Sequence, residues 1–142
     1  GGYSALMLAI ERPQLIRCVA AYAPLTDLPL RFGSSDWNAD PLQRSAQERL
    51  YGDPATALDS LQQRSPLYRF QALRPALLLG HGQRDRRVHP EHSERLALVL
   101  GEAGRPPELH RYANEAHGLT RVSNQIDWYG RVLAFLRREL GE

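Results

Sequence analysis

The sequence predicts an α/β fold in which parallel strands are covered by helices on both faces. Short apolar runs of strand length alternate with longer segments of helical periodicity. The run Ala76–Gly80 is apolar throughout, as expected for a strand of a parallel sheet that is buried on both sides. Alternation of this kind implies right-handed crossover connections between neighbouring strands.

The first part of the chain is predicted as a helix, a strand and an irregular stretch. Gly2–Arg12 is rich in Ala, Leu, Met and Ile and ends before Pro13, which predicts a buried helix. Leu15–Tyr22 is predicted as a strand. Leu28–Asp40 contains Pro, Gly, Ser and Asn without a clear period, so we expect an irregular excursion there.

Two short helices should follow. Pro41–Leu50 and Pro54–Gln62 each carry proline near the first turn, and Asp40 and Asp53 stand where N-caps are expected. Together with the irregular stretch, they predict a helical insertion at about residues 28–64.

The second half of the chain alternates strands and helices. Leu67–Leu73 leads into the strand Ala76–Gly80, His89–Gly101 is predicted as an amphipathic helix, and Glu108–Tyr112 as the last strand. The last helix, Asn124–Leu140, is expected to turn one apolar set inward: Ile126, Trp128, Val132, Leu133, Phe135 and Leu136. Three strands make a thin sheet, and the opening helix has no strand before it. The sequence therefore predicts the C-terminal part of a larger domain, whose missing N-terminal part would be a partner.

Composition narrows the functional classes. The 142 residues suit a single domain, 1–142, and the 18 basic residues, all arginine, are scattered among 16 acidic ones, so we expect no nucleic-acid surface. The longest apolar runs are strand-sized, so no membrane contact is expected, and in the absence of a visible signal peptide we expect a cytoplasmic protein. The single cysteine, Cys18, is interpreted as a small core residue.

An acid and a histidine stand at the ends of two successive predicted strands. Asp85 follows Ala76–Gly80, and His117 follows Glu108–Tyr112. Active sites of open α/β sheets lie outside the carboxyl ends of the strands, and this order matches the last two members of a Ser…Asp…His triad. The aspartate would orient the imidazole, which would act as general base and acid. The alternatives are a helix-capping aspartate and an ordinary loop histidine.

Metal and cofactor binding are not expected. His89 and His92 are three positions apart at a helix start, but no third ligand is evident at a suitable spacing. His81 could be a partner in the acid loop or simply a strand-end residue. The run from Gly80 to Asp85 lacks the third glycine of a dinucleotide loop.

Taken together, these motifs resemble the prolyl oligopeptidase family of serine peptidases. The family's acid motif, His-Gly-x-x-Asp-x-x-Val, is matched by His81–Val88, and its histidine motif, Glu-x-His-Gly, is matched by Glu115–Gly118. Arg64–Leu67 and Ala23–Asp27 look like the family too, so the likeness runs along essentially the whole chain. The resemblance implies an α/β-hydrolase catalytic domain in which the acid and the histidine of these motifs are catalytic.

The resemblance also implies where the nucleophile stands. The family's serine lies in Gly-x-Ser-x-Gly-Gly-Tyr, and this chain opens with Gly1, Gly2 and Tyr3. We therefore expect the serine two positions before Gly1, outside the sequence, together with the oxyanion donors. Ser4 is unsuitable, because it would lie in the first helical turn without the strained strand-to-helix elbow that exposes a nucleophile. The isolated chain is expected to be inactive.

By the same resemblance, four residues are expected to bind the substrate: Leu25, Leu28, Arg87 and Val88. Leu28 stands where some members carry a pocket aromatic, which argues against a strict proline preference. Apolar loop packing is the equally weighted alternative for both leucines. The arginines around Asp85 are interpreted as a solvated rim, with binding of an anionic substrate group as the alternative.

The sequence thus predicts part of a serine peptidase that cleaves peptide bonds through an acyl-enzyme. An esterase of the same fold is an alternative, because fold and triad do not determine the bond that is cleaved. Two hypotheses of a different class are a non-catalytic fragment or interaction module and a small-ligand flavodoxin-like module. The expected partner is a peptide or an acyl ester, and an exposed edge of the first strand would also favour a homo-oligomer.

Overall fold

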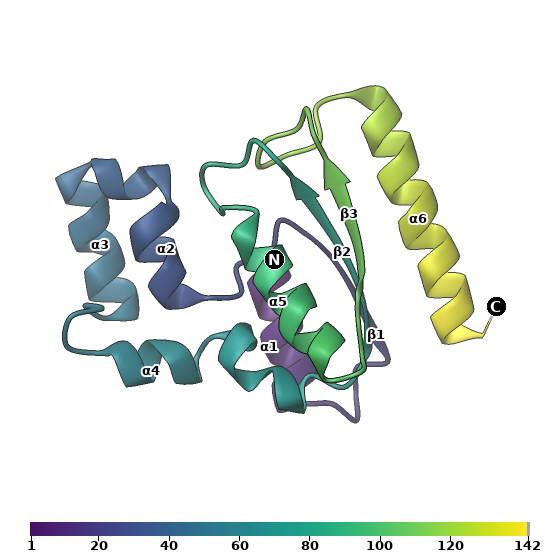
Figure 1. Ribbon diagram of the computed structural model, residues 1–142, viewed down its shortest axis with the longest axis horizontal. Helices are drawn as coiled ribbons and strands as arrows, with labels where there is room; N and C mark the ends of the chain where they lie inside the picture. Colours follow the sequence, from purple (N-terminus) through teal and green to yellow (C-terminus); the bar gives the residue numbers. More distant parts are fainter. Residues whose placement is uncertain (142) are drawn as a thin grey trace.

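The core of the molecule is a three-stranded parallel sheet. The computed structural model describes residues 1–141, and in it β1 (Cys18–Tyr22), β2 (Ala76–Gly82) and β3 (Glu108–Tyr112) lie side by side in sequence order (Figure 1). Val19 is in register with Leu77 in the first pair of strands. The predicted α/β fold is confirmed.

Two helices cover one face of this sheet. They are α1 (Gly2–Glu11) and α5 (Glu91–Glu102), which lie on the same side of the strands in Figure 1. Their buried side chains pack against alternate residues of β1 and β2 in the largest apolar cluster, which includes Leu6, Ala9, Ile10, Val19, Ala21, Leu77, Leu79, Leu96 and Leu100. This packing holds the strand ends, and the loops that follow them, in fixed positions.

The opposite face is covered by α6 (Val122–Leu140). Its Trp128 and Phe135 are buried with Leu78 of β2 in a second apolar cluster. Two members of the predicted inward set were wrong, since Ile126 is 70% exposed and Leu133 is 50% exposed. Each lies two positions before a buried residue, which is about 200° around the helix.

The predicted insertion, residues 28–64, is helical from its first residue. It contains α2 (Leu28–Ser34), a short 3-10 helix (Asp36–Ala39), α3 (Pro41–Tyr51) and α4 (Leu58–Gln63), and a second 3-10 segment (Pro66–Ala72) leads into β2. The predicted irregular excursion over Leu28–Asp40 was therefore wrong. Asp27 caps the first helix, accepting the Leu30 N–H at 3.1 Å, and Pro29 stands in its first turn.

The two predicted caps had different outcomes. Asp40 is the N-cap of α3, and its carboxylate accepts the Leu42 N–H at 2.9 Å, as predicted. Asp53 instead accepts the Ala55 N–H at 2.9 Å and stabilises a turn, so the following helix starts only at Leu58 and not at Pro54.

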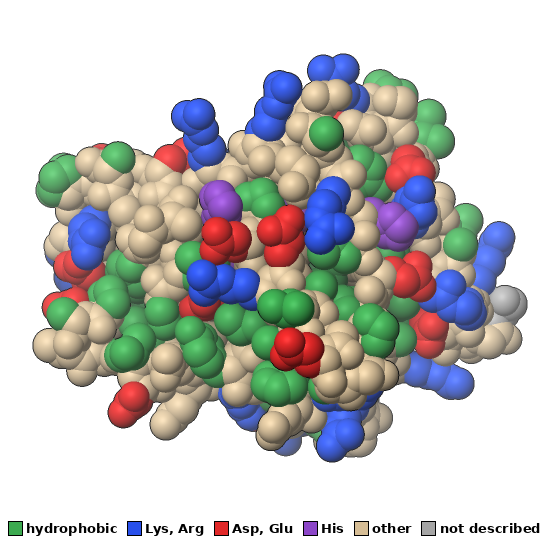
Figure 2. Space-filling model, viewed as in Figure 1, with side chains coloured by type: hydrophobic (Ala, Val, Ile, Leu, Met, Phe, Trp, Pro, Cys, Tyr) green, Lys and Arg blue, Asp and Glu red, His purple; other side chains and the backbone are tan. Residues whose placement is uncertain are grey.

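The charged side chains do not form a patch of one sign on the face shown in Figure 2, where acidic and basic groups alternate. Within residues 1–141, every helix is too short or too polar to span a bilayer. At one edge of the sheet lies β1, and self-association through that edge stays a prediction.

Candidate active site

Two loops meet at the carboxyl edge of the sheet. The acid loop follows β2 and the histidine loop follows β3, and because the strands are parallel and adjacent, both loops leave on the same side. Backbone hydrogen bonds join them directly: Gln83 N–H donates to the Tyr112 carbonyl at 3.0 Å and Arg84 N–H to the Glu115 carbonyl at 2.9 Å. The relative position of the two loops is therefore set by main-chain contacts.

This junction brings together the predicted acid and base. His117 Nδ1 lies 2.9 Å from Asp85 Oδ2. A carboxylate can only accept, so Nδ1 must carry the proton, which leaves the Nε2 lone pair of the neutral ring for another partner. The His117 side chain is 44% exposed, whereas that of Asp85 is fully buried. This geometry would allow the imidazole to exchange protons through Nε2 while the carboxylate orients the ring.

The acid loop is folded around the carboxylate of Asp85. Its Oδ1 accepts the backbone N–H groups of Arg87 and Val88, each at 2.9 Å, while Oδ2 faces the two histidines His81 and His117. Burial alone would raise the pKa of Asp85, but the hydrogen bonds from His81, Val88 and His117 outweigh it and lower the pKa to about 2. The side chain is therefore ionised at neutral pH.

His81 holds the acid loop in shape. Its Nε2 donates to the Val88 carbonyl at 2.8 Å and lies 3.4 Å from Asp85 Oδ2, and its Nδ1 accepts from the Ser93 hydroxyl at 2.7 Å. The ring is fully enclosed, with 1% exposure. His81 thus connects the strand end, the acid and the start of α5. The sequence alone did not decide whether His81 is a partner in the acid loop or simply a strand-end residue.

Glu115 does the same for the histidine loop. Its fully buried carboxylate accepts four hydrogen bonds of 2.8 to 2.9 Å, from the N–H and hydroxyl of Thr120, the N–H of Arg121 and the amide of Asn124. Those donors, first of all the Thr120 N–H, lower the pKa of Glu115 to about 2. In the sequence, Glu115 could be identified only as the first residue of the histidine motif. Its structural role could not be predicted, because it depends on hydrogen-bond donors that follow it in the folded loop.

Replacing Glu115 by Gln should disturb this loop. All four groups around the Glu115 carboxylate donate hydrogen bonds. The NH2 group of a glutamine also donates, so it would replace one acceptor oxygen and face at least one donor that has lost its partner. In the protein that carries the nucleophile, we expect kcat to fall about 10- to 100-fold through displacement of His117, together with a lower thermal midpoint. The matched control is Glu102→Gln on the exposed end of α5. Equal kcat values in the two variants would contradict this role.

The four predicted substrate residues lie in two different environments. Leu25, Leu28 and Val88 belong to a buried apolar cluster with Phe32 and Leu61, and Leu28 has no exposed surface. Both leucines are therefore packed among apolar side chains in this chain, which agrees with the alternative interpretation of apolar loop packing. Arg87 is exposed beside Trp37, with its Cζ 5.7 Å from the indole centroid. Substrate contact by these residues stays a prediction.

His92 has a structural role. Its Nδ1 accepts the backbone N–H groups of Thr26 and Asp27, each at 3.2 Å, and burial lowers its pKa to about 3. It therefore holds the loop after β1 against α5 as a neutral ring. No group of three His, Cys, Asp or Glu side chains within residues 1–141 is arranged to hold a metal ion.

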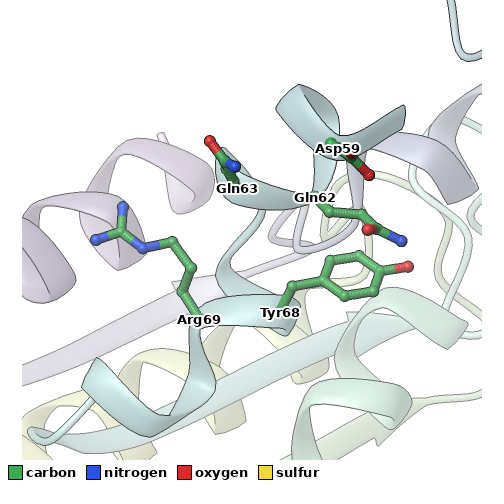
Figure 3. A pocket seen from close by; sticks show the side chains of 5 residues that line it. All are labelled: Asp59, Gln62, Gln63, Tyr68 and Arg69. Carbon is green, nitrogen blue, oxygen red and sulfur yellow. The ribbon is translucent and has the colours of Figure 1, made fainter. Parts of the chain in front are cut away.

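One surface hollow has the predicted acid in its lining. An open hollow next to the pair is lined by Gln83, Arg84, Asp85, Arg86 and His89. Another hollow, shown in Figure 3, lies between α4 and the 3-10 segment before β2 and is lined by Asp59, Gln62, Gln63, Tyr68 and Arg69. None of the predicted site residues lines the second hollow, so we place the candidate site at the first.

Comparison with known proteins shows the family of the chain. The sequence model of the prolyl oligopeptidase family matches residues 1–142, so the chain belongs to that family. The family that the motifs resemble is therefore the family to which the chain belongs.

Individual relatives are peptidase-like proteins. The chain is 29% identical over 136 residues to mouse inactive dipeptidyl peptidase 10, and 29% identical over 141 residues to dipeptidyl peptidase family member 2 of Caenorhabditis elegans. It covers 95% and 98% of itself in these alignments but only 16% and 15% of the relatives, so it spans about a sixth of their length. A puromycin-hydrolyzing peptidase of Mycobacterium tuberculosis has a similar structure, with a TM-score of 0.86 at 25% identity over 99% of this chain and 20% of that one.

Proposed function

We propose that this chain supplies the acid and the general base of a serine peptidase whose nucleophile precedes Gly1. The observation that carries the proposal is the 2.9 Å contact between His117 Nδ1 and the buried carboxylate of Asp85. Membership of the family alone is not sufficient, because one of the relatives is named an inactive peptidase.

The fold supports a serine that precedes Gly1 and lies near the two site loops. Gly2 packs so closely on the loop after β1 that an added Cβ would lie 2.9 Å from Pro24 Cα. The residues before Gly1 would then enter near the carboxyl edge of the sheet, where both site loops lie. Ser4 is an exposed residue inside α1, and no hydrogen bond connects it to His117 within residues 1–141.

In the proposed mechanism, the serine oxygen attacks the carbonyl carbon of the scissile bond while His117 Nε2 accepts its proton. The imidazolium then donates that proton to the leaving amine, and water repeats the sequence to release the acyl group. Asp85 stays ionised throughout, fixes the ring through Nδ1 and stabilises its positive charge. The oxyanion donors would come from outside residues 1–142.

An ester substrate would fit the same pair of residues, so the bond that is cleaved must be measured. Aminoacyl nitroanilides and the matching nitrophenyl esters should be compared on the protein that carries the nucleophile. Cleavage of the nitroanilides supports a peptidase, whereas turnover of the esters alone would contradict it.

The position of the nucleophile can be tested by covalent labelling. A fluorophosphonate probe should label the longer protein at the serine two positions before Gly1, and should not label residues 1–142 expressed alone. The reason is that no hydroxyl group within residues 1–141 forms a hydrogen bond with His117. Labelling of the shorter chain at Ser4 would overturn this part of the proposal.

A further inference from the structure

A buried arginine in the insertion has no anionic partner among residues 1–141. Arg31 of α2 is 9% exposed, and the only hydrogen bond of its guanidinium within residues 1–141 runs from Nε to Gln47 Oε1, at 2.8 Å. No Asp or Glu in that part of the chain forms an ion pair with it. Buried arginines are rarely left without a carboxylate, because the loss of hydration must be compensated. The charge of Arg31 is therefore free to attract an anion from outside.

Two aromatic rings hold the guanidinium plane. The Arg31 Cζ lies 5.2 Å from the centroid of the Trp37 indole and 5.7 Å from that of the Tyr51 ring. With Nε bonded to Gln47, the two terminal nitrogens remain, side by side, in the arrangement that binds a carboxylate through two parallel hydrogen bonds. Gln47 is itself 6% exposed, and its Nε2 is a buried donor without an acceptor among the described residues.

The guanidinium borders an open cavity in the surface, with a volume of about 230 Å³. Most of the cavity wall is apolar, and its lining includes Arg31, Trp37, Ala46, Gln47, Leu50 and Tyr51. A cavity with apolar walls and one cation suits a hydrocarbon chain that ends in a carboxylate. A phosphate group carries more charge than a single guanidinium offsets, so a carboxylate is the better match for Arg31.

The cavity is attached to the acid loop. The Asp36 N–H donates to the Arg86 carbonyl at 2.8 Å, and Arg87 lies against the same indole as Arg31. The indole of Trp37 is therefore in contact both with the Arg31 guanidinium and with that of Arg87, which stands two positions after Asp85. A peptide whose scissile bond lies at the Asp85–His117 pair could reach the cavity with a neighbouring side chain.

We propose that Arg31, held by Gln47 between Trp37 and Tyr51, forms a subsite for a carboxylate group of the peptide substrate. The proposal rests on the peptidase function proposed above. The carboxylate could be the side chain of Asp or Glu or the C-terminus of a short peptide, and the experiment separates these sources.

The test uses the protein that carries the nucleophile. Peptides that differ only by Glu or Gln at each position near the scissile bond, and peptides with a free or an amidated C-terminus, are compared by kcat/KM. For one of these carboxylates, we expect a preference of about tenfold or more over its neutral partner. Arg31→Gln should abolish that preference and Arg31→Lys should retain part of it, whereas Arg44→Gln, on the exposed side of α3, should leave it intact.

A further variant separates binding from folding. Gln47→Glu places a carboxylate on Arg31 from within the chain, so it should raise the thermal midpoint while removing the preference for the acidic peptide. Wild-type protein that cleaves every acidic and neutral pair equally would overturn the subsite. So would an Arg31→Gln variant that melts like the wild type and keeps the preference.

A binding measurement keeps the subsite testable if no peptide is cleaved. Titration with butanoate should change the fluorescence of the half-exposed Trp37, and the neutral butanamide should not; the other tryptophan, Trp128, is buried elsewhere. The change should be absent in Arg31→Gln and in Trp37→Phe. Binding without hydrolysis would contradict only the proposed function, whereas hydrolysis without butanoate binding or acidic preference would contradict only the subsite.

Discussion

Replacement of Asp85 by Asn should lower kcat about 10⁴-fold in the protein that carries the nucleophile, with little change in KM. The Asn amide can present its NH2 group to His117 Nδ1, which would then have to accept, and the ring proton would move to Nε2. The base would lose the lone pair that the serine needs. An amide also fails to stabilise the imidazolium that forms during attack.

The matched control for this prediction is Asp40→Asn, at an exposed N-cap that asparagine can also fill. Its kcat should equal that of the wild type. A loss of less than tenfold in Asp85→Asn, assayed well below the thermal midpoint of the variant, would contradict the assignment of Asp85 as the orienting acid.

The same substitution predicts a pH dependence of stability. The folded-state pKa of Asp85, about 2, lies below its ordinary value of 3.8. Its stabilising contribution, about 2 kcal/mol, is therefore fully present above about pH 4 and is lost as the pH falls through about 2. The difference in unfolding free energy between wild type and Asp85→Asn should be largest at neutral pH and shrink in acid. A difference that is the same at pH 7 and pH 2.5 would contradict this origin.

Much of the site could be predicted because its key residues follow strands. An acid after Ala76–Gly80 and a histidine after Glu108–Tyr112 must meet if the two strands are adjacent and parallel, and strand periodicity alone indicated both conditions. The distance between Asp85 and His117 could not be predicted, because it depends on loop contacts. The Arg84 N–H to Glu115 carbonyl bond and the four donors around the Glu115 carboxylate come from residues without a periodic pattern.

The errors have local physical causes. The helix from Leu28 is marked in the sequence only by its N-cap Asp27 and by Pro29 in the first turn, while its Pro, Gly and Ser residues are typical of a loop. Ile126 and Leu133 were expected to be inside because they are apolar, but a helix on one face of a sheet buries a single stripe. The burial of Arg31 could not be foreseen at all, since an arginine in an apolar stretch gives no signal of what surrounds it.

Gly82→Ala should separate the two site loops. Gly82 ends β2, and a Cβ there would lie 2.5 Å from the Glu115 carbonyl oxygen and closer still to that of Ala116. Both contacts are with backbone atoms of the histidine loop, which cannot rotate away as a side chain would. We expect a loss of about 1 to 3 kcal/mol in unfolding free energy, as for other overpacked sites, and a fall in kcat of about 100-fold or more as His117 moves away from Asp85.

The chain offers a matched control in Gly101→Ala, because a Cβ at that position of α5 would meet no atom of residues 1–141 within 4 Å apart from its chain neighbours and the backbone of its own helix. Alanine is the better helix former, so the control should keep its kcat and gain about 0.5 to 1 kcal/mol in stability. If Gly82→Ala were as stable and active as Gly101→Ala, the close approach of the loops would not be what positions His117. Gly82→Ala could also keep its kcat but lose stability. The end of β2 would then have moved without displacing the histidine loop, and the main-chain contacts between the loops would not control the geometry of the Asp85–His117 pair.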